Sequence, residues 1–275
     1  MTTALDGKRI GFIGCGAMAR ALAGGLVAAG VDTARLSGAD PVAAQRKAFA
    51  DEHGGAVFEH NGDIVAHSDV VVIAVKPDSV ALVLQGLDGA SDLKRPVWIS
   101  IAAGTTLASI GEGLPSGARI IRAMPNTPAL VRAGATAYTP NPEATAEDLA
   151  AAHALFEAVG TAWRAPSESM LDAVTGLSGS GPAYVFLLLE ALADAGVRVG
   201  LPRGAAHDLA CQTVFGATKL AIESGRHPAS LKDQVTSPGG TTIAGLEQLE
   251  AGGVRAAIYR AVAAATARSR ELSGN

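Results

Sequence analysis

The chain has 275 residues, which is enough to bury a sizeable hydrophobic core in one large or two ordinary domains. Hydrophobic residues make up 48% of the chain and charged residues 17%, a composition typical of a compact globular protein and not of a disordered one. The net charge of −4 and the lack of a basic run argue against a nucleic-acid partner, and the apolar runs are too short and too often broken to predict a membrane span.

The N-terminal residues 9–22 predict a β-strand, a tight turn and the start of a helix. Arg9 to Ile13 is short and apolar with β-branched residues, as in a buried parallel strand. The next residues follow a G-x-G-x-x-A pattern and lead into an alanine-rich helix over 17–29. Glycines in such a turn let the backbone approach a pyrophosphate, which the free N–H groups of the helix N-terminus bind. Its place after a predicted strand favours a dinucleotide site over an ordinary βα turn.

A second strand is expected over 34–39 and ends at Asp40. An acidic residue at this place commonly binds the adenosine ribose hydroxyl, which favours NAD over NADP. Two other interpretations stay open. Asp40 and Pro41 begin the next helix as its N-cap and first residue, or Arg46 and Lys47 on that helix bind the 2′-phosphate of NADP.

Further strands alternate with helices along the first half of the chain. Strands are expected over 56–58, 70–75, 97–101, 118–123 and 161–164, with helices over 61–67 and 145–159. Lys76 follows one of these strands, Ala102 and Ala103 follow another, and a rigid polar turn over 124–128 follows a third. The alternation predicts an α/β fold with a doubly wound, mainly parallel sheet, whose ligands lie at the carboxyl ends of its strands.

The composition changes after Pro166. Strand-like runs disappear, and apolar helices are expected over 182–199, 202–223, 241–250 and 254–272, with glycine-rich interruptions at 176–182 and 237–240. We therefore place a domain boundary near Ser167, with a dinucleotide-binding domain over 1–166 and an all-α domain over 167–275. Helices this apolar would expose too much nonpolar surface on a lone small domain, so we expect a dimer formed through them.

Residues 235–242 concentrate four hydroxyl groups and two adjacent glycines around the start of a helix. The N-terminal N–H groups of that helix, together with the hydroxyl of Thr241 or Thr242, form a cradle for a small carboxylate. The alternative is a solvated loop with a Ser or Thr helix cap, which is common in any protein.

The sequence lacks the patterns of a metal site or a redox pair. The histidines are scattered without metal-ligand spacing, and the two cysteines, Cys15 and Cys211, lie far apart. The N-terminus shows no signal-peptide layout. We therefore expect no metal and a reduced, cytoplasmic protein, and hydride transfer from a nicotinamide needs no metal.

These motifs make the chain resemble the pyrroline-5-carboxylate reductase family, which catalyses the last step of proline biosynthesis. The resemblance runs from Ile10 to about Leu272 and is carried by the turn at 14–19, the stretches 74–77 and 124–128, residues 175–184 (TGLSGSGPAY), and residues 231–233 leading into 237–242. It implies a Rossmann-type domain followed by an all-α dimerisation domain. It also implies NADPH as cofactor, with NADH as the alternative, and a homodimer that in this family often assembles into a decamer.

The resemblance further implies which residues form the site. Cofactor contacts are implied for Gly14, Cys15, Gly16, Ala17, Met18, Ala19, Asp40, Asn61, Val75, Lys76, Pro77, Ile101, Ala102 and Ala103. Substrate contacts are implied for Glu168, Gln234, Ser237, Gly240, Thr241 and Thr242. Two residues depart from the family pattern, since relatives often carry serine in place of Asp40 and asparagine in place of Gln234. The first departure bears on an NADPH preference, whereas the second keeps an amide.

The implied reaction is hydride transfer from NAD(P)H to the C=N carbon of 1-pyrroline-5-carboxylate, giving L-proline. An iminium carbon accepts hydride readily once its nitrogen is protonated, so the task of the enzyme is to position the substrate. We expect Thr242, as the catalytic residue, to hydrogen-bond the ring nitrogen and to relay a proton without donating its own. Two alternatives are a β-hydroxyacid dehydrogenase-like enzyme, which would need a catalytic lysine such as Lys232, and a non-catalytic nicotinamide-binding redox sensor.

Overall fold

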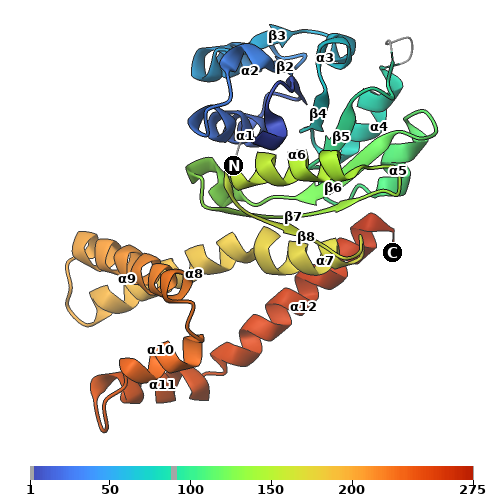
Figure 1. Ribbon diagram of the computed structural model, residues 1–275. Helices are drawn as coiled ribbons and strands as arrows, with labels where there is room; N and C mark the ends of the chain where they lie inside the picture. Colours follow the sequence, from blue (N-terminus) through green and yellow to red (C-terminus); the bar gives the residue numbers. More distant parts are fainter. Residues whose placement is uncertain (1–2, 88–91, 275) are drawn as a thin grey trace. The chain divides into compact units, whose positions relative to one another are not determined.

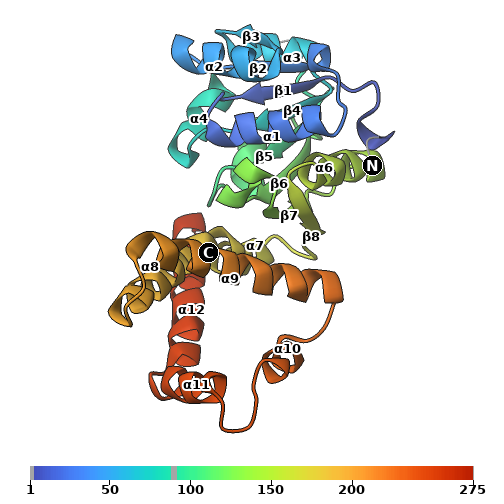
Figure 2. The ribbon, with the colours of Figure 1, turned by 90° about the vertical axis from the view of Figure 1, so that its left-hand side faces the viewer.

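The computed structural model describes residues 3–87 and 92–274. The chain forms two compact units: unit 1 comprises residues 1–180 and 264–275, and unit 2 comprises residues 181–263. Unit 1 contains an eight-stranded sheet, and unit 2, all of whose residues are described, is helical (Figures 1 and 2). The units are defined by packing and the expected domains by composition, so the boundary near Ser167 stays a prediction.

The sheet of unit 1 has the strand order β3-β2-β1-β4-β5-β6-β7-β8. Its strands are β1 (Ile10–Ile13), β2 (Leu36–Ala39), β3 (Ala56–Phe58), β4 (Val70–Ile73), β5 (Val97–Ser100), β6 (Arg119–Met124), β7 (Gly134–Pro140) and β8 (Gly160–Arg164). Neighbouring strands are parallel except β6 and β7, which are antiparallel. The strand order reverses between β1 and β4, as in dinucleotide-binding sheets. The predicted doubly wound, mainly parallel sheet is therefore confirmed.

Helices cover both faces of this sheet. They are α1 (Ala17–Ala28), α2 (Ala43–His53), α3 (Asn61–His67), α4 (Pro77–Gln85), α5 (Leu107–Glu112) and α6 (Ala146–Glu157). Leu22 of α1, Phe49 of α2 and Phe156 of α6 share one hydrophobic core. A second core unites Ile64 of α3 with residues of α4 and α5. Between the two cores, β1, β4 and β5 are buried along their whole length, which explains their continuous apolar sequences.

Unit 1 also contains α7 (Met170–Val174), a π-helical turn (Thr175–Gly179) and the end of α12 (Val254–Ser273). Asp172 of α7 is 2% exposed and accepts hydrogen bonds from the hydroxyls of Ser269, at 2.7 Å, and Ser273, at 3.3 Å. This buried carboxylate therefore fixes the end of α12 on α7.

Unit 2 contains α8 (Gly181–Arg198), α9 (Arg203–Ser224), α10 (Pro228–Gln234), α11 (Thr241–Ala251) and the first part of α12. Helices α8 and α9 pack side by side (Figure 1). The buried apolar residues of the unit are small, namely Ala193, Ala206 and Ala210, whereas Phe186 and Phe215 are 63% and 60% exposed. Unit 2 thus presents large apolar side chains that its own helices do not cover, as expected for helices that meet a second copy.

Several elements differ from the sequence predictions. Strand β7 and helices α4, α5, α7 and α10 have no counterpart among the predicted elements. The strand expected over 34–39 begins with a 3-10 turn at Thr33–Arg35, and the strands expected over 70–75 and 97–101 end at Ile73 and Ser100. These strands end early because the chain leaves the sheet to form the loops at its carboxyl edge.

The glycine-rich stretch expected to interrupt the helices at 176–182 does not do so. Most of it forms the π-turn, so α7 and α8 belong to one helix of 29 residues, Met170–Arg198, whose most apolar 18-residue window has a mean hydropathy of 1.2. The apolar runs within this segment are nevertheless short and broken by glycines and acidic residues, as expected. Among the described residues, this helix is long and apolar enough to cross a membrane by length and composition, but a single such helix is weak evidence of a span.

Candidate active site

The predicted glycine turn connects β1 to α1. Gly14 has φ +94°, and a Cβ at this position would lie 2.7 Å from the carbonyl oxygen of Ala74. Gly16 is the N-cap of α1, no side chain caps the helix, and a Cβ on Gly16 would meet nothing within 4 Å. The first N–H groups of α1 therefore have no capping side chain and follow a residue with open space beside it. This arrangement fits the pyrophosphate of a dinucleotide.

Two alanine substitutions separate the roles of these glycines. Gly14→Ala is expected to destabilise the protein by about 1–3 kcal/mol, because alanine disfavours a positive φ and the added Cβ meets backbone. Gly16→Ala should leave the thermal unfolding temperature unchanged, because its Cβ points into open space. It should weaken dinucleotide binding, because that Cβ occupies space where the pyrophosphate is expected. Thermal denaturation and fluorescence titration measure the two effects. An equal loss of stability in both variants would contradict this assignment.

Cys15 lies in the same turn and is fully buried. Burial, and then the charge of Asp40, raise the pKa of its thiol to about 12. The thiol therefore stays protonated at neutral pH, which argues against a redox switch in the turn.

Asp40 follows β2 and joins the glycine turn through its carboxylate. Oδ2 accepts a hydrogen bond from the N–H of Cys15 at 3.0 Å, and Oδ1 accepts one from the N–H of Val42 at 2.8 Å. Helix α2 begins at Ala43 with Val42 as its N-cap, so the interpretation of Asp40 and Pro41 as cap and first helical residue is wrong. The carboxylate instead hydrogen-bonds the backbone of the glycine turn, at Cys15, and the residue that caps α2, Val42.

The two cations suggested for a 2′-phosphate are both engaged by protein groups. Arg46 Nη1 donates to the carbonyl oxygens of Asp40, at 2.7 Å, and Pro41, at 3.1 Å. Lys47 forms an ion pair with Asp51. A 2′-phosphate at this position would have to compete for these side chains and would face the Asp40 carboxylate.

The parallel strands bring the other predicted cofactor residues to the same edge of the sheet. The N–H of Ala74 donates to Ile13 O at 2.8 Å, and the N–H of Ile101 donates to Ile73 O at 3.1 Å. Residues 75–77 therefore continue from β4, which pairs with β1, and residues 101–103 continue from β5, the next strand along the sheet. Lys76 is the N-cap of α4. Asn61 begins α3, after β3 at the margin of the sheet. The structure thus brings the predicted cofactor segments together at the carboxyl ends of the strands.

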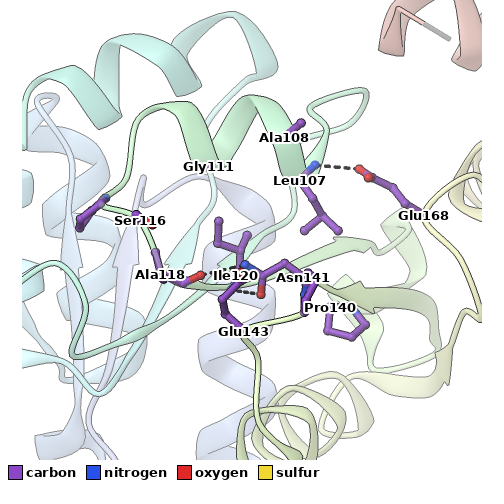
Figure 3. A pocket seen from close by; sticks show the side chains of 13 residues that line it. Leu107, Ala108, Gly111, Ser116, Ala118, Ile120, Pro140, Asn141, Glu143 and Glu168 are labelled. Atoms are coloured by element: carbon purple, nitrogen blue, oxygen red, sulfur yellow. Dashed lines mark hydrogen bonds between the residues drawn. The ribbon is translucent and has the colours of Figure 1, made fainter.

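Glu168 lies in unit 1, in the segment after β8. Its Oε1 accepts hydrogen bonds from the N–H of Leu107 and from Nη1 of Arg122, each at 2.7 Å, and Arg122 is 4% exposed. Figure 3 shows the contact with Leu107, beside a cavity of about 500 Å³ that extends along α5 to Ala118 before β6. Arg122 and Leu107 were not predicted as partners of Glu168, and its role in binding substrate stays a prediction.

The remaining predicted substrate residues lie in unit 2, at the end of α10 and in the loop and first turn of α11. Gln234 ends α10, Gly240 is the N-cap of α11, and Thr241 and Thr242 are its first two residues. The Gly240 N–H donates to Ser237 O at 3.1 Å, which closes the loop before the helix. No side chain caps α11, so its first N–H groups stay available beside the two threonine hydroxyls.

The lysines of unit 2 do not show the isolation expected of a catalytic base. Nζ of Lys232 forms an ion pair with Oδ1 of its neighbour Asp233 at 3.8 Å, and Nζ of Lys219 forms one with Oε1 of Glu223 at 3.6 Å. All four side chains are at least half exposed. Within the parts of the chain that the structure describes, no cluster of three or more His, Cys, Asp or Glu side chains is placed to hold a metal ion.

Comparisons with known proteins agree with this arrangement. Residues 168–272 match the family model for pyrroline-5-carboxylate reductase dimerisation, and residues 9–104 match that of the coenzyme F420-dependent NADP oxidoreductases. The chain is 46% identical to the pyrroline-5-carboxylate reductase of Methanosarcina acetivorans, over 98% of this chain and 99% of the relative.

Two solved structures are similar over nearly the whole chain. The pyrroline-5-carboxylate reductase of Coxiella burnetii superposes with a TM-score of 0.92 at 39% identity, covering 97% of this chain and 98% of its own. The pyrroline carboxylate reductase of Plasmodium falciparum, solved with NADP bound, superposes with a TM-score of 0.85 at 32% identity. The superposition covers 98% of this chain and 99% of the Plasmodium chain.

Proposed function

Because the chain belongs to the pyrroline-5-carboxylate reductase family, we propose that it reduces 1-pyrroline-5-carboxylate to L-proline with a nicotinamide cofactor. It is an NAD(P)-dependent oxidoreductase acting on an imine. The observation that carries the proposal is the presence in one chain of two helix N-termini that have a glycine as N-cap and lie in different surroundings. That of α1 follows a glycine turn and suits a dinucleotide, and that of α11 lies among hydroxyl groups and suits a small carboxylate.

NADP(H) is the cofactor supported by the NADP oxidoreductase match over 9–104 and by the NADP-bound relative. The N–H groups at the start of α1 would hold its pyrophosphate, Asp40 lies where the adenosine ribose binds, and residues 75–77 and 101–103 would hold the remaining half. When bound, the nicotinamide supplies the hydride. NADH is the alternative cofactor, and Asp40 is the residue on which the preference depends.

The substrate is a cyclic imine that carries a carboxylate. The first N–H groups of α11, with the Thr241 hydroxyl and the Ser237 loop, bind the carboxylate, because a helix N-terminus favours negative charge. The Thr242 hydroxyl hydrogen-bonds the ring nitrogen, which orients the imine carbon for hydride addition. Gln234 and Glu168 are the other residues for which we propose a substrate contact.

Initial rates of NADPH and NADH oxidation with 1-pyrroline-5-carboxylate test the proposal. We expect turnover with this substrate and none with 3-hydroxyisobutyrate and oxidised cofactor. Turnover of the hydroxy acid alone would support the dehydrogenase alternative and contradict the role of Thr242. Cofactor binding without turnover of either substrate would support a redox sensor.

The chain contains the dimerisation region of its family at 168–272 and forms a homo-oligomer. The exposed phenylalanines of α8 and α9 supply apolar surface for this contact. We propose a homodimer that assembles further into a decamer, located in the cytoplasm and without a nucleic-acid or membrane partner. Analytical ultracentrifugation of the purified protein distinguishes a dimer from a decamer.

A further inference from the structure

Asn126 connects three elements of unit 1 through its side chain. It is 9% exposed and follows β6 in the turn that leads to the 3-10 helix Thr127–Val131. Its Nδ2 donates to Ser178 O at 3.0 Å, and its Oδ1 accepts from the N–H of Ala135 at 2.9 Å. Asn126 therefore links the end of β6 to the start of β7 and to the π-turn. Its partner in the π-turn, Ser178, lies 52 residues further along the sequence.

The π-turn that Asn126 contacts is an unusual local structure. The Ser180 N–H donates to Thr175 O at 2.8 Å, five residues back, and the Thr175 hydroxyl donates to Leu171 O at 2.8 Å. A Cβ on Gly179 would lie 2.7 Å from Cε of Met124, the last residue of β6, so the turn packs closely on the end of this strand. Single π-turns are rare and occur frequently at functional sites.

The register of the sheet places this contact at the cofactor edge. Ser100 of β5 pairs with Arg122 of β6 in parallel register, so the carboxyl ends of these two strands, Ser100 and Met124, lie at the same edge of the sheet. Asp40, the residue proposed for the adenosine half, lies on the opposite side of the point where the strand order reverses. A dinucleotide spans that point, so its nicotinamide half extends toward the ends of β4, β5 and β6.

We infer that Asn126 is a positioning residue for the nicotinamide half of the cofactor, acting through the π-turn Thr175–Gly179. This inference rests on the proposed function. The Nδ2 donor holds the carbonyl of Ser178 and so keeps the turn in π geometry against Met124. Without that donor the segment is expected to return to the more stable α-helical spacing, which withdraws it from the end of β6 and enlarges the nicotinamide end of the site.

The chain offers a matched control at the other end of the same strand. Asn141 accepts from the Ile120 N–H at 2.9 Å and donates to Ala118 O at 2.8 Å, as Figure 3 shows. It therefore joins two backbone segments with the same pair of bonds as Asn126. At either asparagine, aspartate removes the donor and keeps an acceptor, whereas alanine removes both. Asn141 contacts the amino end of β6, away from the cofactor edge.

The experiment compares Asn126→Asp and Asn126→Ala with Asn141→Asp and Asn141→Ala. NADPH and 2′-phospho-ADP-ribose, which lacks the nicotinamide, are titrated against each variant, and thermal unfolding is recorded. For both Asn126 variants we expect the NADPH Kd to rise about tenfold while the Kd of the fragment stays within about twofold. The Asn141 variants should unfold at lower temperature and keep the wild-type ratio of the two Kd values. If Asn126→Asp and Asn126→Ala change the two Kd values alike, the effect comes from the lost donor and not from the negative charge that aspartate adds.

An equal weakening of both probes in the Asn126 variants would overturn the inference, since it would show a general loss of structure. The same change of ratio in the Asn141 variants would overturn it as well. A wild-type protein that binds neither probe overturns the proposed function itself. Binding of the fragment with normal affinity by a variant that holds NADPH weakly supports both.

Discussion

Thr242→Ala is expected to lower kcat/KM for 1-pyrroline-5-carboxylate by about a hundredfold, the usual effect of removing one positioned hydrogen-bond donor from an active site. Thr242 is the second residue of α11 and is partly exposed beside the uncapped helix N-terminus. We expect most of the loss in kcat, because the hydroxyl orients the ring nitrogen, whereas the carboxylate binds to the backbone N–H groups. Steady-state kinetics with saturating NADPH measure both parameters.

Two variants control this prediction. Thr242→Ser keeps the hydroxyl and should recover most of the activity. Thr236→Ala removes a hydroxyl of the same loop that already donates to Lys232 O at 2.7 Å, and it should change kcat/KM little. If Thr242→Ala kept the wild-type kcat/KM, the proposed role of the hydroxyl would be wrong and positioning would depend on the backbone of α11 alone.

Asp40→Asn is expected to raise the preference for NADPH over NADH by about tenfold or more, since a like charge next to the 2′-phosphate costs several kcal/mol. The substitution removes the charge and keeps one oxygen to accept from Cys15 or Val42. The ratio of kcat/KM for the two cofactors, measured at constant ionic strength because salt screens the phosphate, reports the effect.

Asp40→Ser and Lys47→Ala complete this comparison. Serine at position 40 shortens the side chain as well as removing the charge, so a similar ratio in both variants would assign the effect to charge. Lys47 pairs with Asp51, and its removal should leave the ratio unchanged. An unchanged ratio in both Asp40 variants would show that the carboxylate only braces the glycine turn.

The sheet was predictable where burial on both faces imposes a continuous apolar sequence, as in β1 and β4. Strand β7 lacks that signal. Its sequence GATAYTP contains Thr136 and Thr139, which are both buried, so polar and small residues occupy positions that pattern analysis assigns to a loop. The π-turn was missed for a related reason. Glycine and serine disfavour a helix locally, and long-range contacts such as that of Ser178 with Asn126 hold this one in place.

The cofactor edge was predictable because its motif is local: the turn at 14–19 includes both the glycines and the helix start. The hydrogen bonds of Asp40 could not be predicted, because only the folded backbone brings the N–H of Cys15 near its carboxylate. The N–H groups of Cys15 and Val42 compete with any ligand for this carboxylate. Asn126 was noticed only as part of a polar turn. Its partner Ser178 lies 52 residues away, and no spacing rule links the two.

The interleaving of the two units has a consequence for biosynthesis. Asp172 is buried in unit 1 and accepts hydrogen bonds from the hydroxyls of Ser269 and Ser273. These serines follow Asp172 by 97 and 101 residues in the sequence, after all of unit 2. The nascent dinucleotide-binding unit therefore cannot satisfy this carboxylate until the ribosome has made the whole helical unit, and a chain that stops earlier leaves it without either hydroxyl. The contact between α7 and the end of α12 therefore forms late in translation, after the strands of the sheet and all of unit 2 have been made.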